Sequence, residues 1–98
     1  MSESGFDANA IDETIHGRVR LGIMAYLAQS SPAAFTELAQ VLETTNGNLS
    51  VHLTKLEGAG YVAVSKRFEG KKPLTEVTLT EAGAAAWSRY LDTLRALF

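Results

Sequence analysis

The sequence predicts a small, mainly helical domain of the α+β class, with four helices and one β-hairpin. Hydrophobic residues recur at helical spacing over residues 12–29, 36–42, 45–59 and 80–98, whereas residues 62–79 alternate in steps of two. A chain of 98 residues has room for one domain. Its hydrophobic and charged fractions, 46% and 20%, are those of a folded globular protein rather than a disordered one.

The first segments predict a tail, a helix and a short extended link. Residues 1–11 are polar and aperiodic, so we expect a disordered tail there. A helix is expected from Asp12, acting as its N-cap, to about Gln29. It carries two apolar stripes on different sides, and a helix that is apolar on two faces needs two packing partners. Residues 33–35 predict a very short strand or an extended link before the next helix.

Residues 35–64 predict a helix-turn-helix followed by a strand. Thr36 is expected to cap the first of these helices, and Thr45 or Asn46 the second. The leucines of the second helix share one arc of the helical wheel: Leu49, Leu53 and Leu56. The opposite face is small and polar, which lets a helix backbone approach base edges in a DNA major groove. An ordinary solvated helix face has the same composition, so this segment alone leaves both interpretations open.

The net charge of −2 opposes a nucleic-acid partner unless the charges are unevenly distributed. Residues 1–13 carry four acids and no base, whereas residues 45–75 carry five bases and two acids. Positive charge therefore gathers on the second helix-turn-helix helix and on the hairpin. The hairpin loop is expected over residues 69–73, with Lys71 and Lys72 at a tip that can reach DNA phosphates or a minor groove. A lysine-rich hairpin is also a common protection of a sheet edge against aggregation.

The last helix carries a wider apolar stripe than a half-buried surface helix needs. Thr80 followed by Glu81 predicts its N-terminus. Large exposed apolar patches are rare, so a second copy of the chain is the expected cover, and a homodimer through the first and last helices is favoured over packing within one chain. The expected interface residues are Leu21, Met24, Ala28, Trp87, Tyr90, Leu91, Leu94, Leu97 and Phe98.

The order of these elements, together with the runs NLSVHLTKLEGAGYV, KRFEGKKP and LTEAG, resembles bacterial and archaeal winged-helix transcriptional regulators. The resemblance is to the MarR and ArsR groups, most of all to short single-domain winged-helix DNA-binding proteins, and covers residues 12–98. It implies a winged helix-turn-helix fold and a dimeric repressor on double-stranded DNA. Each subunit would place one helix in successive major grooves of a near-palindromic operator, with its hairpin, or wing, on the flanking minor groove or backbone.

The resemblance also implies which residues face DNA: Thr45, Asn46, Asn48, Ser50, Val51, His52, Lys55, Lys66, Arg67, Lys71 and Lys72. Asparagine amides can bond base edges, Val51 can meet a thymine methyl group, and the lysines would neutralise phosphate. His52 borders the leucine arc, so it has two possible places. It can contact DNA, or it can be buried and bonded to a backbone carbonyl. Leu74 and Ala84 stand where related proteins often carry arginine, which implies a weaker grip on phosphate.

Several other functions are not expected. The chain has no cysteine, and His16 and His52 lie far apart in sequence, so the metal site of ArsR-type sensors has no ligands here and no metal or other cofactor is predicted. The extra helices that hold ligands in MarR relatives are missing, which argues against a small-molecule effector. No glycine-rich phosphate loop or nucleophile-base arrangement supports an enzyme.

No apolar run approaches the roughly 20 residues that span a bilayer, and the acidic N-terminus lacks the basic region of a secretory signal, so we expect a cytoplasmic protein without a membrane partner. The main alternative function is a winged-helix module that binds another protein and has no DNA binding of its own. The salt dependence of binding distinguishes the two functions, because only binding to DNA phosphates weakens steeply as salt is added.

Overall fold

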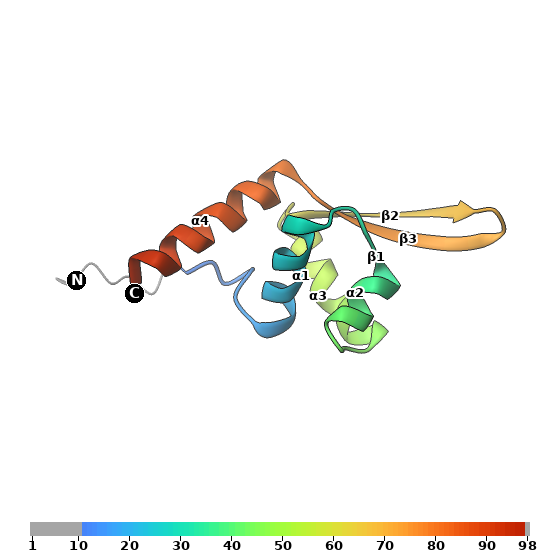
Figure 1. Cartoon of the computed structure of the whole chain (residues 1–98), viewed down its shortest axis with the longest axis horizontal. Helices are drawn as coiled ribbons and strands as arrows, with labels where there is room; N and C mark the ends of the chain where they lie inside the picture. The colour runs from blue at the N-terminus through green and yellow to red at the C-terminus, as the bar shows by residue number, and fades with distance from the viewer. Residues whose placement is uncertain (1–10, 98) are drawn as a thin grey trace.

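The computed structural model describes residues 11–97 and confirms the predicted α+β class and order of elements (Figure 1). The described part of the chain contains four helices and a three-stranded antiparallel sheet. In chain order the elements are α1 (Arg18–Gln29), β1 (Ala33–Ala34), α2 (Phe35–Val41), α3 (Asn46–Gly58), β2 (Val62–Glu69), β3 (Lys72–Leu79) and α4 (Glu81–Leu97). The expected tail over residues 1–11 lies, apart from Ile11, outside the described residues, as does Phe98.

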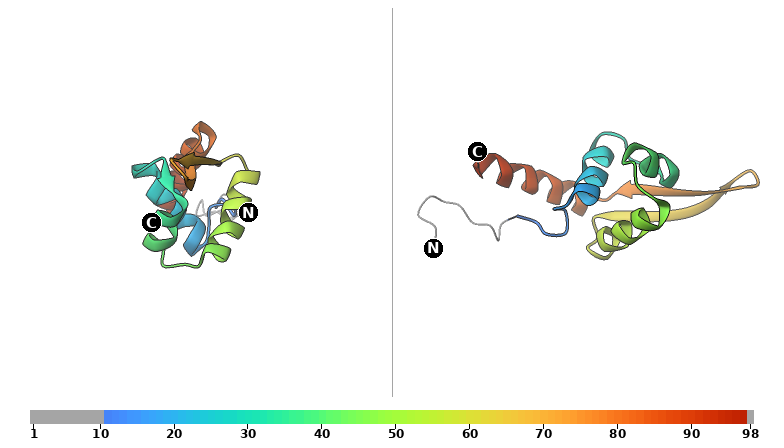
Figure 2. Two further views of the ribbon diagram at one scale, coloured as in Figure 1. Left: turned by 90° about the vertical axis from the view of Figure 1, so that its right-hand side faces the viewer. Right: turned by 90° about the horizontal axis from the view of Figure 1, so that it is seen from below.

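The core lies between the first three helices and the base of the sheet. The helices contribute fully buried side chains such as Ile23, Leu38 and Leu49, and the strands contribute Val62 and Val77. The sheet order is β1-β3-β2, so β3 is the central strand. Two ends project from this core in opposite directions, with α4 at one end and the paired strands β2 and β3 at the other (Figures 1 and 2).

The first helix begins later than predicted. It starts at Arg18 rather than near Asp12, because Gly17 has a φ of 133° that a helix does not allow. Asp12 instead closes a separate turn, in which its Oδ1 accepts a hydrogen bond from the Thr14 N–H at 2.9 Å. Its other carboxylate oxygen accepts from the Tyr61 hydroxyl at 2.8 Å. Asp12 therefore ties the N-terminal segment to the start of β2 rather than capping α1.

The predicted cap of the second helix is also wrong, because α2 begins at Phe35, one residue before Thr36. Ala34 pairs with Glu76 in β3 and is extended, so the chain passes from strand to helix without a spacer. The role of a cap falls to Glu37, which reaches back to accept the Ala34 N–H at 3.4 Å. The Glu37 carboxylate also accepts a hydrogen bond from Tyr26, which joins α2 to α1.

The third helix follows the prediction closely. The Thr45 hydroxyl accepts a hydrogen bond from the Asn48 N–H at 3.1 Å, which is the geometry of an N-cap. The helix ends at Gly58, and Gly60 two residues later has a φ of 81°. Its boundaries are therefore determined by residues within the helix and directly beside it.

The hairpin turn is tighter than the predicted loop over residues 69–73. Strands β2 and β3 pair in continuous register from Val62 opposite Leu79 to Glu69 opposite Lys72, so only Gly70 and Lys71 form the turn. Gly70 has a φ of 65°, which two-residue hairpin turns of this kind require. The ladder therefore extends further toward the free end than the sequence indicated.

The last helix starts as predicted, with the Thr80 hydroxyl accepting the Gly83 N–H at 2.9 Å. Gly83 lies against the start of β2, where a Cβ atom added to it would come within 2.0 Å of the Tyr61 carbonyl oxygen. The first turn of α4 is thus packed against backbone, while its later turns leave the core (Figure 2).

Candidate nucleic-acid interface

The outer face of α3 is an exposed surface of small and polar side chains. The opposite face of α3 packs into the core, where Leu49, Leu53 and Leu56 are at most 3% exposed. The residues predicted to face DNA from this helix and its cap are exposed, apart from half-buried His52: Thr45, Asn46, Asn48, Ser50, Val51 and Lys55. Val51 keeps 56% of its surface accessible, which is unusual for a large apolar side chain on a packed helix. A helix held this way can enter a groove without losing its own packing.

The Asn48 side chain is held in place at the start of the helix. Its Nδ2 donates a hydrogen bond to the Thr44 hydroxyl at 2.8 Å, while its backbone N–H is bonded to Thr45. The amide oxygen remains available to a donor from outside. Fixing a recognition side chain before binding lowers the conformational entropy lost when the contact forms.

His52 lies on the flank of α3 that faces α1. Its Nδ1 is 3.3 Å from Nη1 of Arg20, where the sequence left a choice between DNA and a backbone carbonyl. Burial, followed by the charges of Arg20 and Lys55, lowers the pKa of His52 below its ordinary value. A neutral ring can accept the hydrogen bond from the guanidinium. His52 therefore links the outer helix to α1 and stays only partly accessible to a ligand.

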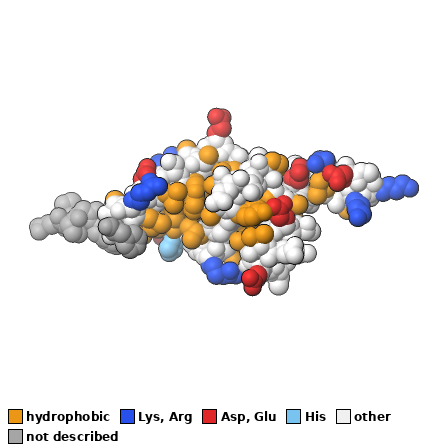
Figure 3. Space-filling model, viewed as in Figure 1, with side chains coloured by type: hydrophobic (Ala, Val, Ile, Leu, Met, Phe, Trp, Pro, Cys, Tyr) orange, Lys and Arg blue, Asp and Glu red, His pale blue; other side chains and the backbone are white. Residues whose placement is uncertain are grey.

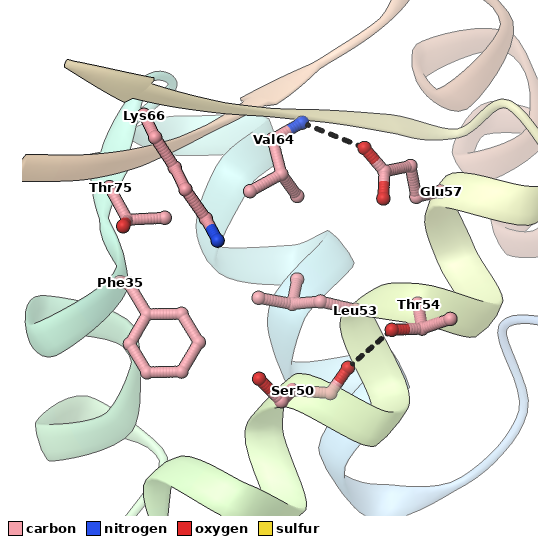
Figure 4. Close-up of a pocket in the computed structure, with 8 residues that line it drawn as sticks. All are labelled: Phe35, Ser50, Leu53, Thr54, Glu57, Val64, Lys66 and Thr75. Carbon is pink, nitrogen blue, oxygen red and sulfur yellow. Dashed lines mark hydrogen bonds between the residues drawn. The ribbon is translucent and has the colours of Figure 1, made fainter.

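The opposite flank of α3 borders a cavity of about 330 Å³ beneath β2 and β3 (Figure 4). Leu53 and Val64 are among its apolar lining residues, and Ser50 and Thr54 also line it, with the Thr54 hydroxyl donating a hydrogen bond to the Ser50 carbonyl oxygen at 2.9 Å. Lys66 points into this cavity from β2, so it lies beside α3 rather than at the hairpin tip (Figure 4). The remaining lining residues are Phe35, Glu57 and Thr75. One predicted phosphate contact thus sits in the angle between the helix and the hairpin.

The free end of the hairpin carries unpaired positive charge (Figure 3). Lys71 and Lys72 are exposed, and neither takes part in the salt bridges found within residues 11–97. Arg67 differs, because its Nε is 3.2 Å from Oε1 of Glu76, which raises the pKa of Arg67 through the hydrogen bond and the charge. The two lysines are therefore the cations that can meet phosphate most directly.

The profile of the winged helix DNA-binding domain matches residues 19–98, which include α3, the hairpin and α4. The chain belongs to this winged-helix family. It is 35% identical to a transcriptional regulator homologue from Pyrococcus horikoshii OT3, whose structure aligns with a TM-score of 0.83 over 88% of this chain and 85% of that one. An uncharacterized protein of Methanocaldococcus jannaschii is 34% identical over 73 residues, which are 74% of this chain and 79% of the relative.

More distant structures share the winged-helix fold. YusO from Bacillus subtilis aligns with a TM-score of 0.78 at 16% identity, over 91% of this chain and 62% of that one. MepR from S. aureus, solved as a complex with DNA, aligns with a TM-score of 0.66 at 16% identity, over 89% of this chain and 67% of that one. At such identities the likeness concerns the fold alone.

The predicted dimer residues of this winged-helix chain fall into two groups. Met24 and Tyr90 are 0% and 3% exposed, so they belong to the core of the single chain and add little area to an interface. The Tyr90 hydroxyl lies 3.1 Å from Nδ1 of His16. The Tyr90 ring stacks on the Trp87 ring, with 5.8 Å between the ring centroids. The others keep accessible surface: Leu21, Ala28, Trp87, Leu91, Leu94 and Leu97. Figure 3 shows hydrophobic side chains gathered over α4 and the helices beside it.

Sequence reasoning missed two residues of the winged-helix surface. Arg20 supports His52 from a position 32 residues away, which periodicity within one helix does not reveal. Phe68 is 71% exposed on the hairpin, although period-two alternation marked it only as a strand residue. Alternation could have indicated that Phe68 shares a face with Val64 and Lys66.

Neither a metal site nor a membrane-spanning helix is found among residues 11–97. No group of three or more histidine, aspartate or glutamate side chains that could hold a metal ion occurs among them. No helix in this part of the chain has the length and hydrophobicity needed to cross a membrane.

Proposed function

We propose that this chain is a sequence-specific transcriptional regulator that binds double-stranded DNA as a homodimer. The observation that carries the proposal is the outer face of α3, which is small, polar and exposed while three buried leucines hold the helix rigidly beside a basic hairpin. A major groove accepts an α-helix of this kind. In this arrangement α3 reads bases, and the wing, residues 62–79, lies on the flanking backbone or minor groove.

The proposed roles follow from the chemistry and placement of each side chain. Asn46 and Asn48 bond base edges, with adenine preferred, and Val51 contacts a thymine methyl group. Thr45 and Ser50 contact bases or phosphates, as their hydroxyls donate and accept. Phosphate neutralisation falls to the bases of the flanks and the wing: Lys55, Lys66, Arg67, Lys71 and Lys72. His52 supports α3 through Arg20 and contacts DNA at most with its exposed edge.

The proposed dimer is formed by α1 and α4, so that two α3 helices read a near-palindromic operator. Its support is the partly exposed apolar surface of Leu91 and Leu97 on the outer half of α4, next to Leu94, which packs against the core. Occupying an operator would make the protein a repressor. The P. horikoshii relative is described as a transcriptional regulator homologue, which favours a role in transcriptional regulation here.

The test is a gel shift of the purified chain against fragmented genomic DNA of its source, including its own upstream region, at low and moderate salt. A retained fragment that resists competitor DNA supports sequence-specific regulation, and its half-site spacing tests the dimer. The slope of log affinity against log salt should be near 0.9 per neutralised phosphate. No shift even at low salt would overturn the proposal and favour a protein-binding module, for which exposed Val51 and Phe68 would be the contacts.

A further inference from the structure

We propose that the wing carries an apolar wedge, formed by Phe68 and Pro73, that packs into the minor groove beside the major groove occupied by α3. The proposal rests on the proposed DNA binding and assigns a contact residue, Phe68, that neither the family pattern nor the basic charge of the wing indicates. The lysines around it would hold the adjacent phosphates.

The strand register places both residues on the face of the wing that turns toward α3. Phe68 pairs with Pro73 across the hairpin, two positions beyond the pair of Lys66 and Thr75. Successive side chains of a strand point to opposite faces, so Phe68 shares its face with Val62, Val64 and Lys66. Val62 is buried in the core, while Val64, Lys66 and Thr75 line the cavity beside α3 (Figure 4). This face therefore runs from the core, past the cavity, to the exposed pair.

Phe68 is exposed where a folded chain would normally hide it. It is 71% accessible, the highest value among the exposed large hydrophobic side chains of residues 11–97. An exposed phenylalanine beside a proline costs solubility and adds nothing to the core of a single chain. The pair lies one ladder position from the turn, on the part of the hairpin that projects beyond the helices (Figure 1). A ligand that reaches the wing would meet it first.

The positive charges around Phe68 and Pro73 favour a polyanion as the ligand of the wing. Arg67 precedes Phe68, Lys71 and Lys72 precede Pro73, and Lys66 lies two positions away on the same face. Arg67 is paired with Glu76, and Glu69 follows Phe68, so the positive charge free to meet a ligand comes from Lys66, Lys71 and Lys72. A protein partner with an apolar surface would have to desolvate these lysines, whereas DNA can pair them with phosphate. Phenylalanine and proline are among the side chains that minor-groove-binding proteins insert as wedges between base steps. The combination of an apolar pair and three unpaired lysines fits that environment.

The experiment compares Phe68→Ala with Leu74→Ala, which removes an apolar side chain from the other face of the same hairpin. Each is titrated by fluorescence anisotropy onto the duplex retained in the gel shift or, without a specific fragment, onto a random 30-base-pair duplex at low salt. Phe68→Ala should lower affinity roughly tenfold, the scale of burying a phenyl ring, without changing the salt slope because no charge is removed. Leu74→Ala should bind like the parent, and Phe68→Leu should recover most of the affinity.

Hydroxyl-radical footprinting supplies a second measurement, since it reports deoxyribose exposed in the minor groove. The parent should protect a short tract flanking the α3 site, and Phe68→Ala should lose only that tract. Equal affinity and an unchanged footprint for Phe68→Ala would overturn the wedge and leave Phe68 for a protein partner. A parent that binds no duplex would instead contradict the proposed function itself. Phe68 is mostly exposed, so the variant should unfold at the same urea concentration as the parent.

Discussion

The two projecting ends of the molecule, α4 and the β2–β3 wing, share one starting point but expose opposite chemistry (Figures 1 and 3). Along α4 the half-buried side chains Leu91 and Leu97 keep some apolar surface, whereas the free end of the wing carries exposed Lys71 and Lys72 beside Phe68. An apolar surface gains free energy when another apolar surface covers it, and a cationic one when it meets an anion. The same small core therefore directs one end toward a second copy of the chain and the other toward DNA.

The ends also differ in how they are held. The wing has a continuous backbone ladder as far as a two-residue turn, so its shape does not depend on covering its side chains. On the far half of α4 the tertiary contacts come from Tyr90, which is buried and lies 3.1 Å from His16, and from Leu94, which packs against the core. The last turn beyond Leu94 has little of this support, and an isolated helical turn is marginal in water. We infer that the wing is formed before DNA arrives, while α4 gains stability from a partner. Three variants test this contrast, beginning with the largest effect, and a fourth tests the contact between α1 and α3.

Gly83→Ala should disturb both ends at once, because it acts at the junction from which they leave. The new Cβ would lie 2.0 Å from the Tyr61 carbonyl oxygen, so α4 must shift away from the start of β2. We expect the free energy of unfolding in urea to fall by about 3 kcal/mol, the upper range for overpacking. The matched control is Gly47→Ala, whose Cβ meets nothing within 4 Å and should raise stability by up to about 1 kcal/mol. Equal stability of Gly83→Ala and the parent would contradict this account.

Leu91→Glu should affect only the α4 end. Leu91 is partly exposed and lies on the half of the helix that leaves the core, so a charge there would be buried unpaired in a dimer but solvated in a monomer. We expect multi-angle light scattering to show a dimer for the parent and a monomer for the variant. Ala96→Glu adds the same charge to an exposed position of α4 and should remain dimeric. A monomeric parent, or a variant that stays dimeric, would exclude this interface.

Lys71→Ala with Lys72→Ala should affect only the wing end. Both lysines are exposed, so their loss should leave folding unchanged and weaken DNA binding roughly tenfold at moderate salt, similarly for all sequences. The magnitude of the slope of log affinity against log salt concentration should decrease by about 2, one for each phosphate contact that is lost. The control removes two positive charges from the other end, Arg89→Ala with Arg95→Ala, and should keep the slope of the parent. Unchanged affinity of the double lysine variant would refute the wing contact.

His52→Gln should produce the smallest effect, a change in the pH dependence of stability. The pKa of His52 is lowered in the folded chain by burial and by the charges of Arg20 and Lys55, with Glu13 and Thr14 lining the neighbouring surface. When the pH falls below about 6.5, the ordinary pKa of histidine, His52 therefore takes up a proton in the unfolded chain more readily than in the folded chain. The free energy of unfolding is unaffected by the protonation of His52 above pH 6.5, and it decreases as the pH falls from 6.5 through the lower pKa that His52 has in the folded chain. Urea midpoints from pH 8 to 5 should fall less for His52→Gln, and parallel curves would disprove the effect.

Prediction from sequence succeeded where structure depends on neighbouring residues. The α3 helix was anticipated from its Thr45 cap to its glycine end, and α4 from its Thr80 cap, because a cap and the N–H it bonds are three residues apart. The small outer face of α3 followed from the spacing of its leucines alone. The family match over residues 19–98 includes α3 and α4.

Prediction failed where distant segments compete for one group. Asp12 reads as a helix cap, but its carboxylate bonds Tyr61, 49 residues away, and α1 begins only at Arg18. Thr36 is also predicted to be a cap, but Ala34 pairs with β3, and the cap position falls at Ala34, two residues before Thr36. In both places the sequence offered a sensible local choice that a tertiary contact replaced.

The sequence by itself determined which segments become helices or strands and which face of each is apolar, because periodicity and capping act over a few residues. Only the tertiary structure decided how those faces are shared. Met24 and Tyr90 are covered within the chain, while Leu91 and Leu97 retain exposed surface. It also placed Arg20 on His52, Lys66 beside α3 and Phe68 in solvent. The physical reason is that burial and hydrogen bonding between distant residues depend on which helices and strands pack together. A pattern within a few neighbouring residues does not contain that information.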